Sequence, residues 1–532
     1  MLDDVDPAAK GPKLRVAFVY RETFWTEGLR KDRYEYYRVA PDLPLGLASV
    51  RSFAQSVPAV AAGTELHNRV YPDTTAEAEA VADIVELRPD VAAFSVYLWN
   101  SPSTLRMARA LKRRLPGLVI VLGGPEVPRD AEARKGLLSR NSSIDVAVGG
   151  EGEEPFAEVL RARLKGAAGF RTRLRGVRGI AFRDGRAIRV TPGRSVITDL
   201  SRIPSPYVSG AASLVEGARG MVTVETSRGC PFSCAFCDYH AGGRRVRRYP
   251  VERLSGEIDL ILSRGFQGLI YVADPILNLD PDRTVKVFGQ LARCRNRIQL
   301  ELKPELLDDP SIRALGRIAF PWVALGIQSI NPKTLENIGR RLDLDRTVAN
   351  IRKLMRLRNI NIFAEFIIGL PGDDYEWMKR SMDWALRFAP ALNVTAFDLV
   401  LLPNSPLAGM QERFRLEVDE EGLVQSCCSF SRQDLVKTSQ LFAAYFYLRD
   451  QSGRYPEFLR AVRRPGQRPS DALEKVAALL VKQGLIPGRE RVIGQGGRRR
   501  GDGPIPGGPA SGSPRWVELS RLAVGMEGES WW

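Results

Sequence analysis

The chain has 532 residues, of which 44% are hydrophobic and 26% are charged. This balance is typical of a folded globular protein, and it excludes wholesale disorder, collagen and a disulfide-rich miniprotein. The net charge of +16 favours anionic ligands or surfaces without identifying one. No apolar run approaches the roughly 18 residues of a spanning helix, and residues 1–13 lack the features of a signal peptide. We therefore expect a soluble, cytoplasmic protein.

Residues 1–165 alternate short apolar runs with helical patterns. Strands are expected at 14–20, 65–70, 91–96, 118–122 and 146–148, and helices at 45–56, 76–87, 103–115 and 154–164. This alternation predicts an α/β domain with a doubly wound, Rossmann-like parallel sheet. Ligands of such sheets bind outside the carboxyl ends of the strands, so the expected binding loops are 97–103, 123–127 and 149–153.

Residues 166–220 differ from the segments on either side. The stretch 179–190 surrounds Asp184-Gly185, a pair that favours a tight turn, and it predicts a hairpin. The residues that follow are rich in Pro, Ser and Gly. We expect a linker with a small sheet of its own.

Strand–helix alternation resumes in residues 221–410. Strands are expected at 221–225, 268–272, 298–303, 322–327, 362–368 and 394–402, and helices at 251–264, 281–294, 311–317, 332–338, 344–358 and 375–388. Six such units are fewer than the eight of a complete TIM barrel, which predicts a partial (β/α)6 barrel or else a flat sheet. In a barrel, chemistry belongs at the carboxyl ends of the strands.

The C-terminal part of the chain divides into two segments. Amphipathic patterns at 434–449 and 471–484 predict a small, mostly helical domain over 411–484. Residues 485–532 are dominated by Gly, Pro and Arg, a composition that cannot bury a core, so we expect this tail to be disordered.

Three cysteines follow the first strand of the predicted barrel with the spacing Cys-x3-Cys-x2-Cys, namely Cys230, Cys234 and Cys237. Thiolates are soft ligands that suit iron–sulfur clusters and zinc. A structural zinc site needs a fourth protein ligand, which His240 could supply. The spacing alone leaves an iron–sulfur cluster, a Cys3His zinc site and three unrelated buried cysteines open.

The segment 226–237, Thr-Ser-Arg-Gly-Cys-Pro-Phe-Ser-Cys-Ala-Phe-Cys, resembles the signature of the radical S-adenosylmethionine (SAM) superfamily, with Phe236 at its aromatic position. Its place after the first of six strand–helix units agrees with that superfamily. The resemblance implies a [4Fe–4S] cluster on three thiolates, with one iron left open for SAM. It also implies reductive cleavage of SAM to a 5′-deoxyadenosyl radical.

Other segments resemble the SAM-contacting parts of the superfamily. Residues 366–372 resemble its glycine-rich adenine-contacting segment, and residues 326–335 its fourth-strand segment. Asp274 follows the second strand, where the superfamily contacts the SAM amino group. Each segment has a plain alternative, a strand-to-helix turn or a polar residue satisfied at a strand end. The resemblance implies SAM contacts from Phe236, Asp274, Gln328, Ser329, Gly369 and Gly372.

An N-terminal parallel domain before a radical SAM core resembles the cobalamin-binding class of these enzymes. The matching motifs are residues 44–47, 123–126 and 144–153. The resemblance implies cobalamin, held by Tyr97, Gly123, Gly124, Glu126, Gly149, Glu151 and Gly152. The Asp-x-His-x-x-Gly motif that supplies a lower cobalt ligand is absent from the sequence. We interpret His67 as a core or edge residue. The lower axial ligand is therefore unassigned, and an ordinary nucleotide-type sheet is the alternative.

The resembled class methylates unactivated carbon or phosphorus centres, although some members close or contract rings instead. We therefore expect a cobalamin-dependent radical SAM methyltransferase that acts on a small molecule or peptide in specialised metabolism, with a ring-forming enzyme as the alternative. The resemblance also implies an electron donor such as a flavodoxin or ferredoxin. No cysteine precedes Cys230, which argues against the methylthiotransferases, because these carry extra cysteines in the N-terminal domain.

A rival from another class is a basic, zinc-containing nucleic-acid-binding protein. The net charge would suit it, but the sequence has no recognised nucleic-acid motif, so we do not expect a nucleic-acid substrate. No side chain stands out as a general acid or base. Tyr97, Trp99, Tyr271 and Glu365 are candidates to line a cavity.

Overall fold

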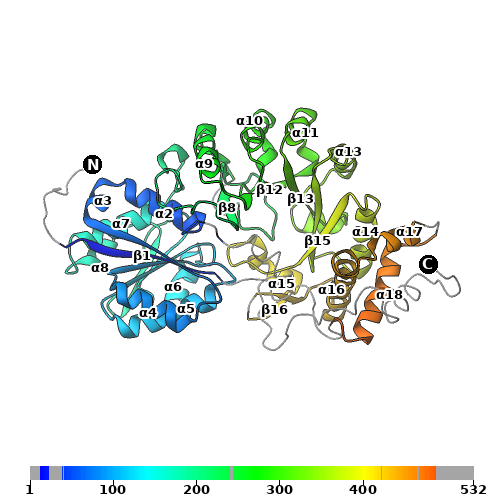
Figure 1. The fold of residues 1–532 in the computed structure, drawn as a ribbon. Helices are drawn as coiled ribbons and strands as arrows, with labels where there is room; N and C mark the ends of the chain where they lie inside the picture. The colour runs from blue at the N-terminus through cyan, green and yellow to red at the C-terminus, as the bar shows by residue number, and fades with distance from the viewer. Residues whose placement is uncertain are drawn as a thin grey trace.

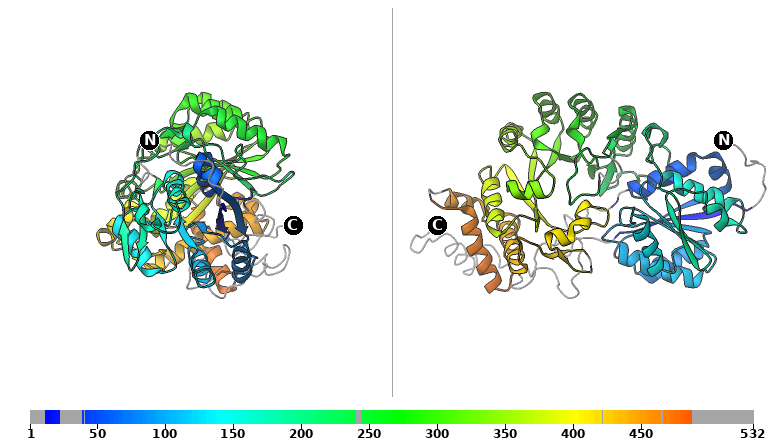
Figure 2. Two further views of the ribbon diagram at one scale, coloured as in Figure 1. Left: turned by 90° about the vertical axis from the view of Figure 1, so that its left-hand side faces the viewer. Right: turned by 180° about the vertical axis from the view of Figure 1, so that it is seen from behind.

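The structure is a computed structural model that describes residues 12–22, 39, 41–239, 244–420, 422–463 and 466–486. Two α/β units lie side by side, and a helical unit packs on the second, away from the first (Figures 1 and 2). This arrangement confirms the predicted fold class. The tail predicted to be disordered lies outside the described residues from position 487 onward.

The first unit is built on a seven-stranded sheet in the order β2-β1-β3-β4-β5-β6-β7. The strands are β1 Leu14–Arg21, β2 Thr64–Tyr71, β3 Val91–Ser95, β4 Val119–Gly123, β5 Val146–Val148, β6 Ile180–Asp184 and β7 Ala187–Val190. Strands β1 to β5 are parallel. The five residues of β3 are all buried, as expected for a parallel strand that is covered on both faces.

The predicted hairpin is present as β6 and β7, but the prediction that it forms a sheet of its own is wrong. Strand β6 pairs antiparallel with β5, with Val146 opposite Phe182, and so extends the first sheet. The reason is burial, because Ile180, Ala181 and Phe182 are inaccessible and need cover on both faces. The pairing also closes the edge of β5, which would otherwise expose unpaired backbone groups.

Helices cover both faces of this sheet (Figure 1). They are α2 Leu45–Ser56, α3 Pro58–Gly63, α4 Glu77–Leu87, α5 Ser101–Arg114, α6 Ala131–Arg140, α7 Glu153–Leu164 and α8 Phe170–Leu174. Helices α2 and α7 share one apolar core with the sheet, and α4 and α5 share the other. No apolar repeat predicts α6, because its only buried residues are Arg134 and Leu138.

The second unit is an open, six-stranded parallel sheet in the order β15-β14-β13-β12-β11-β8, curved into a partial barrel (Figure 1). The strands are β8 Met221–Val224, β11 Leu269–Val272, β12 Arg297–Leu302, β13 Phe320–Gln328, β14 Asn361–Ile368 and β15 Leu392–Asp398. The outer helices are α9 Val251–Ser263, α10 Pro281–Leu291, α11 Asp309–Leu315, α12 Pro332–Asn337, α13 Leu344–Leu354 and α14 Tyr375–Leu386. Burial alternates along β14, with apolar residues buried at every second position.

The C-terminal unit is helical, as predicted, and it packs on α14. Its elements are α15 Gln411–Phe414, the short strands β16 Glu417–Val418 and β17 Val424–Ser426, and the helices α16 Arg432–Phe446, α17 Tyr455–Val462 and α18 Pro469–Lys482. Lys379 of α14 holds α18 through ion pairs to Asp471, at 2.7 Å, and Glu474, at 2.9 Å. Among the described residues, no helix combines the length and the apolarity that a membrane crossing requires.

Polar contacts join the first unit to the barrel. The Asn404 side chain, beyond β15, accepts a hydrogen bond from the Arg129 backbone N–H at 2.8 Å. It also donates one to the Pro125 carbonyl at 2.9 Å. Both partners lie in or beside the loop after β4, so the barrel holds a loop that the sequence predicts to bind a ligand.

Two neighbouring glycines in this loop differ in whether their surroundings would tolerate a side chain. Gly124 has φ +104°, and a Cβ there would lie 2.5 Å from the Val96 carbonyl oxygen. A Cβ on Gly123 would meet no atom within 4 Å. We expect Gly124→Ala to lower the free energy of unfolding by about 2 kcal/mol or more, because it adds left-handed strain to a clash with backbone.

The matched variant Gly123→Ala should stay within about 0.5 kcal/mol of the wild type. Urea unfolding followed by circular dichroism measures both effects. Equal stability of the two variants would contradict the geometry of this loop.

Candidate functional site

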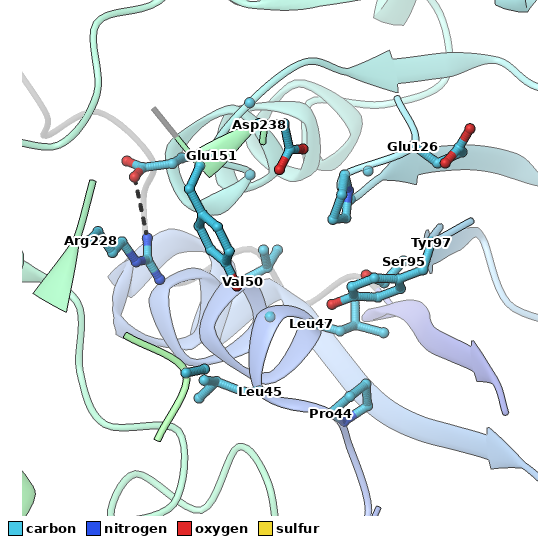
Figure 3. Close-up of a pocket in the computed structure, with 18 of the residues that line it drawn as sticks. Pro44, Leu45, Leu47, Val50, Ser95, Tyr97, Glu126, Glu151, Arg228 and Asp238 are labelled. Carbon is cyan, nitrogen blue, oxygen red and sulfur yellow. Dashed lines mark ion pairs between the residues drawn. The ribbon is translucent and has the colours of Figure 1, made fainter. Parts of the chain in front are cut away.

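A cavity of about 1060 Å³ lies between the two sheets, and residues of both units line it (Figure 3). The first unit contributes the residues that follow β3, β4 and β5, which are the predicted binding loops. The second unit contributes Glu225 after β8, Gln328 at the end of β13 and Asp398 at the end of β15. The carboxyl ends of two parallel sheets therefore face one space.

The structure brings all seven residues predicted to contact cobalamin to the wall of this cavity, namely Tyr97, Gly123, Gly124, Glu126, Gly149, Glu151 and Gly152. The four candidate cavity residues, Tyr97, Trp99, Tyr271 and Glu365, also line it. Helix α2 adds an apolar strip that includes Leu45, Leu47 and Val50 (Figure 3). The sequence motif at 44–47 indicates the start of this strip.

The wall on the side of the first unit fits a large planar cofactor. A Cβ on Gly123 or Gly150 would meet no atom within 4 Å, so bare backbone borders open space at both positions. The ring of Tyr97 stacks on that of Trp99, with centroids 4.6 Å apart and planes inclined by 17°. Flat aromatic surface and open glycine backbone in one cavity can accept a large planar ring such as a corrin.

His67 lies away from this wall. It is on β2, opposite Ala17 of β1, and burial lowers its pKa. Of the histidines that the structure describes, none lines the cavity. The expectation that His67 is a core or edge residue agrees with this position.

The three cysteines lie together in the loop after β8, with Cys234 buried and Cys230 and Cys237 half-buried. Burial raises the pKa of Cys230, and it raises that of Cys237 to about 12. Iron binds the thiolate, so these protons must leave when a metal enters. The guanidinium of Arg340, 3.7 Å from the Cys234 sulfur, offers positive charge that favours a thiolate.

Within the described part of the chain, no three Cys, His, Asp or Glu side chains converge on the position of a single metal ion. The thiolates of an iron–sulfur cluster bind different iron atoms, so they need not converge on one position. Three soft thiolates are a donor set that fits a cluster with one iron left open. His240, the candidate zinc ligand, lies outside the described residues.

Two of the six residues predicted to contact SAM, Phe236 and Gln328, line the cavity. Gln328 has φ +69°, and the pairing of β13 with β14 slips between Gly326 and Gln328. A left-handed conformation is strained for glutamine, and such strain is concentrated at binding sites. The slip turns the end of β13 and presents this amide to the cavity.

The structure places the other four predicted SAM residues behind the cavity wall. Asp274 is buried, and its carboxylate accepts hydrogen bonds from the Thr226 N–H at 2.6 Å and from the Ser227 hydroxyl at 2.7 Å. Burial still raises the pKa of Asp274 to about 6. These bonds fix the start of the cysteine loop, so Asp274 acts on the loop rather than at the cavity surface.

Ser329, Gly369 and Gly372 are packed at the ends of β13 and β14. The Ser329 hydroxyl is buried and accepts a hydrogen bond from the Asn331 backbone. The backbone N–H of Gly372 donates to the Ser429 hydroxyl at 2.8 Å, which ties this turn to the C-terminal unit. Neither turn reaches the cavity wall, so direct SAM contact by these three residues stays a prediction.

Glu151 does not stand free at the cavity wall. Its carboxylate receives two bonds from the Arg247 guanidinium, at 3.0 Å and 2.5 Å. Arg228 lies 3.8 Å away on its other side (Figure 3). Arg247 is buried, although it belongs to the basic run 244–248, because it pairs with a carboxylate of the first unit.

The barrel interior beside the cavity holds the predicted cavity residue Glu365 and a second carboxyl group, Glu301, that no motif reveals. Tyr271 of β11 donates to Glu301 of β12 at 2.5 Å. Glu365 of β14 makes no hydrogen bond or ion pair with the described residues, and burial together with Glu301 raises its pKa to about 8. The signal for Glu301 is the alternation of polar and apolar residues along β12, whose polar positions point inward.

Comparison with protein families gives two matches in chain order. A model of the B12 binding domain matches residues 44–160, and a model of the radical SAM superfamily matches residues 224–385. The first range contains β2 to β5 and the glycine loops. The second range contains the three cysteines and strands β11 to β14 of the barrel.

Two curated relatives match across both units. The cobalamin-dependent radical SAM methyltransferase TokK of Streptomyces tokunonensis is 29% identical over 389 residues, 69% of this chain and 54% of the relative. The 2-(S-pantetheinyl)-carbapenam-3-carboxylate methyltransferase of Streptantibioticus cattleyicolor is 30% identical over 406 residues, 71% of this chain and 56% of the relative. The chain thus spans little more than half the length of these relatives.

A solved structure shares the fold of both units. The cobalamin-dependent SAM radical enzyme OxsB, with aqua-cobalamin and SAM bound, superposes with a TM-score of 0.61 over 90% of this chain and 74% of its own, at 15% identity. The order of the domains, the cysteine loop and the shared cavity agree with these matches. The chain belongs to the cobalamin-dependent radical SAM enzymes, whose cofactors are a [4Fe–4S] cluster, SAM and cobalamin.

Proposed function

We propose that this enzyme is a methyltransferase that acts on an unactivated carbon or phosphorus centre of a small molecule or peptide. One observation carries the proposal, namely that the glycine loops of the B12-binding sheet and the mouth of the radical SAM barrel line a single cavity. A substrate in that cavity can meet both cofactors. Relatives named as methyltransferases support transfer of a methyl group rather than ring formation.

The chain's own residues have separate tasks in this proposal. Cys230, Cys234 and Cys237 hold the cluster, and Arg340 beside Cys234 offsets part of the negative charge of the thiolates. Phe236 and Gln328 face the cavity and contact SAM. When bound, the cluster supplies the electron for SAM cleavage and cobalamin carries the methyl group.

The cavity walls present aromatic and aliphatic side chains to a reactive species. Tyr97 and Trp99 stack on one side, and Tyr20 meets Tyr97 edge to face with centroids 6.1 Å apart. Helix α2 adds the aliphatic side chains of Leu45, Leu47 and Val50. When cofactors and substrate fill the cavity, these surfaces leave less room for water, which limits quenching of a radical before transfer.

Glu365 holds a proton at the barrel mouth. Its carboxyl is neutral at physiological pH because its pKa is about 8. A neutral carboxyl can donate one hydrogen bond and accept another, so it can position a substrate oxygen or nitrogen without a buried charge. Glu365 is therefore a substrate-positioning residue in this proposal.

The cysteine loop gives the first test. Protein reconstituted without oxygen and supplied with hydroxocobalamin, SAM and a reductant should form 5′-deoxyadenosine and S-adenosylhomocysteine, both quantified by mass spectrometry. The Cys230→Ala, Cys234→Ala, Cys237→Ala variant should lose 5′-deoxyadenosine by at least about a hundredfold, since no thiolate is left for iron. Cys428→Ala, at an exposed cysteine, should match the wild type.

The outcomes of this experiment separate the candidate functions. Deoxyadenosine without S-adenosylhomocysteine would favour a ring-forming enzyme over a methyltransferase. Retention of deoxyadenosine in the triple variant would contradict the assignment of the cluster ligands. Protein that holds zinc and no iron after reconstitution would contradict radical chemistry altogether.

The raised pKa of Glu365 predicts a pH effect on stability. The fold favours the protonated carboxyl, so its stabilising contribution is complete below the ordinary pKa of 4.5 and is lost as pH rises through about 8. Between pH 6 and pH 9 the melting temperature of cofactor-free wild type should fall by at least about 3 °C more than that of Glu365→Gln.

The exposed residue Glu216 supplies a control for this effect. The melting temperature of Glu216→Gln should fall as much as that of the wild type over the same pH range. Differential scanning fluorimetry at both pH values measures all three proteins. Parallel pH profiles of wild type and Glu365→Gln would show that the Glu365 carboxyl is already ionised in the folded state.

A further inference from the structure

Arg228 connects the two loops that face each other across the cavity. It lies two residues before Cys230 in the cysteine loop. Its Nη1 is 3.8 Å from Glu151 Oε1 in the glycine loop after β5 (Figure 3). The same nitrogen is 2.8 Å from Oε1 of Glu153, the first residue of α7, which follows that loop. Its Nε is 2.9 Å from Glu225 Oε2, at the end of β8. One guanidinium thus contacts carboxylates of both units.

Arg247 completes this arrangement from the neighbouring strand. Strand β9, Ser227–Arg228, pairs with β10, Arg247–Arg248, and sets Arg228 opposite Arg247. Arg247 holds both oxygens of Glu151 and donates to the Ile197 carbonyl at 2.6 Å. Glu151 therefore lies between two guanidiniums of the second unit.

These groups are withdrawn from solvent. Side-chain exposure is 13% for Arg228, 4% for Glu153 and 3% for Arg247. A buried ion pair is strongly oriented, and loss of one partner leaves a desolvated charge. Movement of the loop 149–153 relative to the cysteine loop would break these ion pairs. The glycines of the loop still allow its backbone more than one conformation when the pairs are broken.

We propose that Arg228 couples the two cofactor sites, so that a cluster in the cysteine loop tightens the binding of cobalamin by the facing glycine loop. The cluster fixes the loop that carries Arg228, and Arg228 then holds Glu151 and Glu153, which flank Gly152 at the cavity wall. Arg228 and Glu153 are positioning residues in this inference, which rests on the proposed function. By reciprocity, bound cobalamin stabilises the cluster loop to the same degree.

The test is a titration with hydroxocobalamin, followed by its visible absorbance, of cluster-free and cluster-reconstituted protein. The dissociation constant of the wild type should be at least about fivefold lower with the cluster in place. The ratio of the dissociation constant without the cluster to that with the cluster is therefore at least about five in the wild type. In Arg228→Gln this ratio should fall to about one. Arg228→Lys should give an intermediate ratio, because lysine keeps the charge but loses the planar fork that spans several carboxylates.

A matched control removes an ion pair within the first unit. Arg163 pairs with Asp90 at 3.3 Å, with side-chain exposures of 16% and 35%, and does not bridge the units. Arg163→Gln should keep the wild-type ratio. A merely structural role of Arg228 would weaken cobalamin binding equally in both cluster states and leave the ratio unchanged.

The inference is overturned if the wild-type affinity does not depend on the cluster, or if folded Arg228→Gln retains the full ratio. If Arg228→Gln does not fold, Glu153→Gln removes the opposite charge of the 2.8 Å pair and should lower the ratio in the same way. A full ratio in Glu153→Gln would also overturn the inference. Failure of the proposed function looks different, because then the protein binds hydroxocobalamin with the same dependence on the cluster but forms no S-adenosylhomocysteine in the product assay.

Discussion

Parallel strands present their carboxyl ends at one edge of a sheet, and this protein places two such edges against one cavity. Every feature of the site depends on that constraint. The glycine loops follow β4 and β5, while the cysteine loop follows β8. The cavity forms only because the two units are held edge to edge, by Asn404 on one side and by Arg228 and Arg247 on the other.

The sequence predicts the features that arise locally. Periodicity predicts the bounds of α2 as the structure has them, and apolar runs predict every strand of the barrel. The rule that ligands bind at the carboxyl ends of parallel strands identifies the loops that reach the cavity. Cysteine spacing by itself leaves zinc and iron open, and the resemblance to a known family decides between them.

Features that depend on long-range pairing could not be predicted. Glu151 pairs with Arg247, which lies 96 residues later in the chain. No local sequence pattern predicts a contact over that separation. Asp274 follows its strand as predicted. Its carboxylate accepts hydrogen bonds from Thr226 and Ser227 instead of facing the cavity, because a buried carboxylate needs hydrogen-bond donors. The hairpin joins the first sheet because β5 offers it an unpaired edge.

The cofactor loops and the polar residues of the barrel interior occupy different parts of the site. The loops proposed to hold cofactors come from strand ends near the interface, whereas Tyr271, Glu301 and Glu365 belong to strands of the barrel. In the proposed function these barrel residues lie nearest to the substrate, so they are the positions at which we expect substitutions to change substrate choice.

In the proposed function, one cavity holds cobalamin on the wall of the first unit, facing a cluster on the cysteine loop. Anomalous diffraction at the cobalt and iron absorption edges, from crystals of reconstituted protein with hydroxocobalamin, locates both metals. We expect cobalt beside Tyr97 and the glycine loops, and iron bound by Cys230, Cys234 and Cys237. Cobalt outside the cavity, or zinc in place of iron at the cysteines, would contradict this expectation.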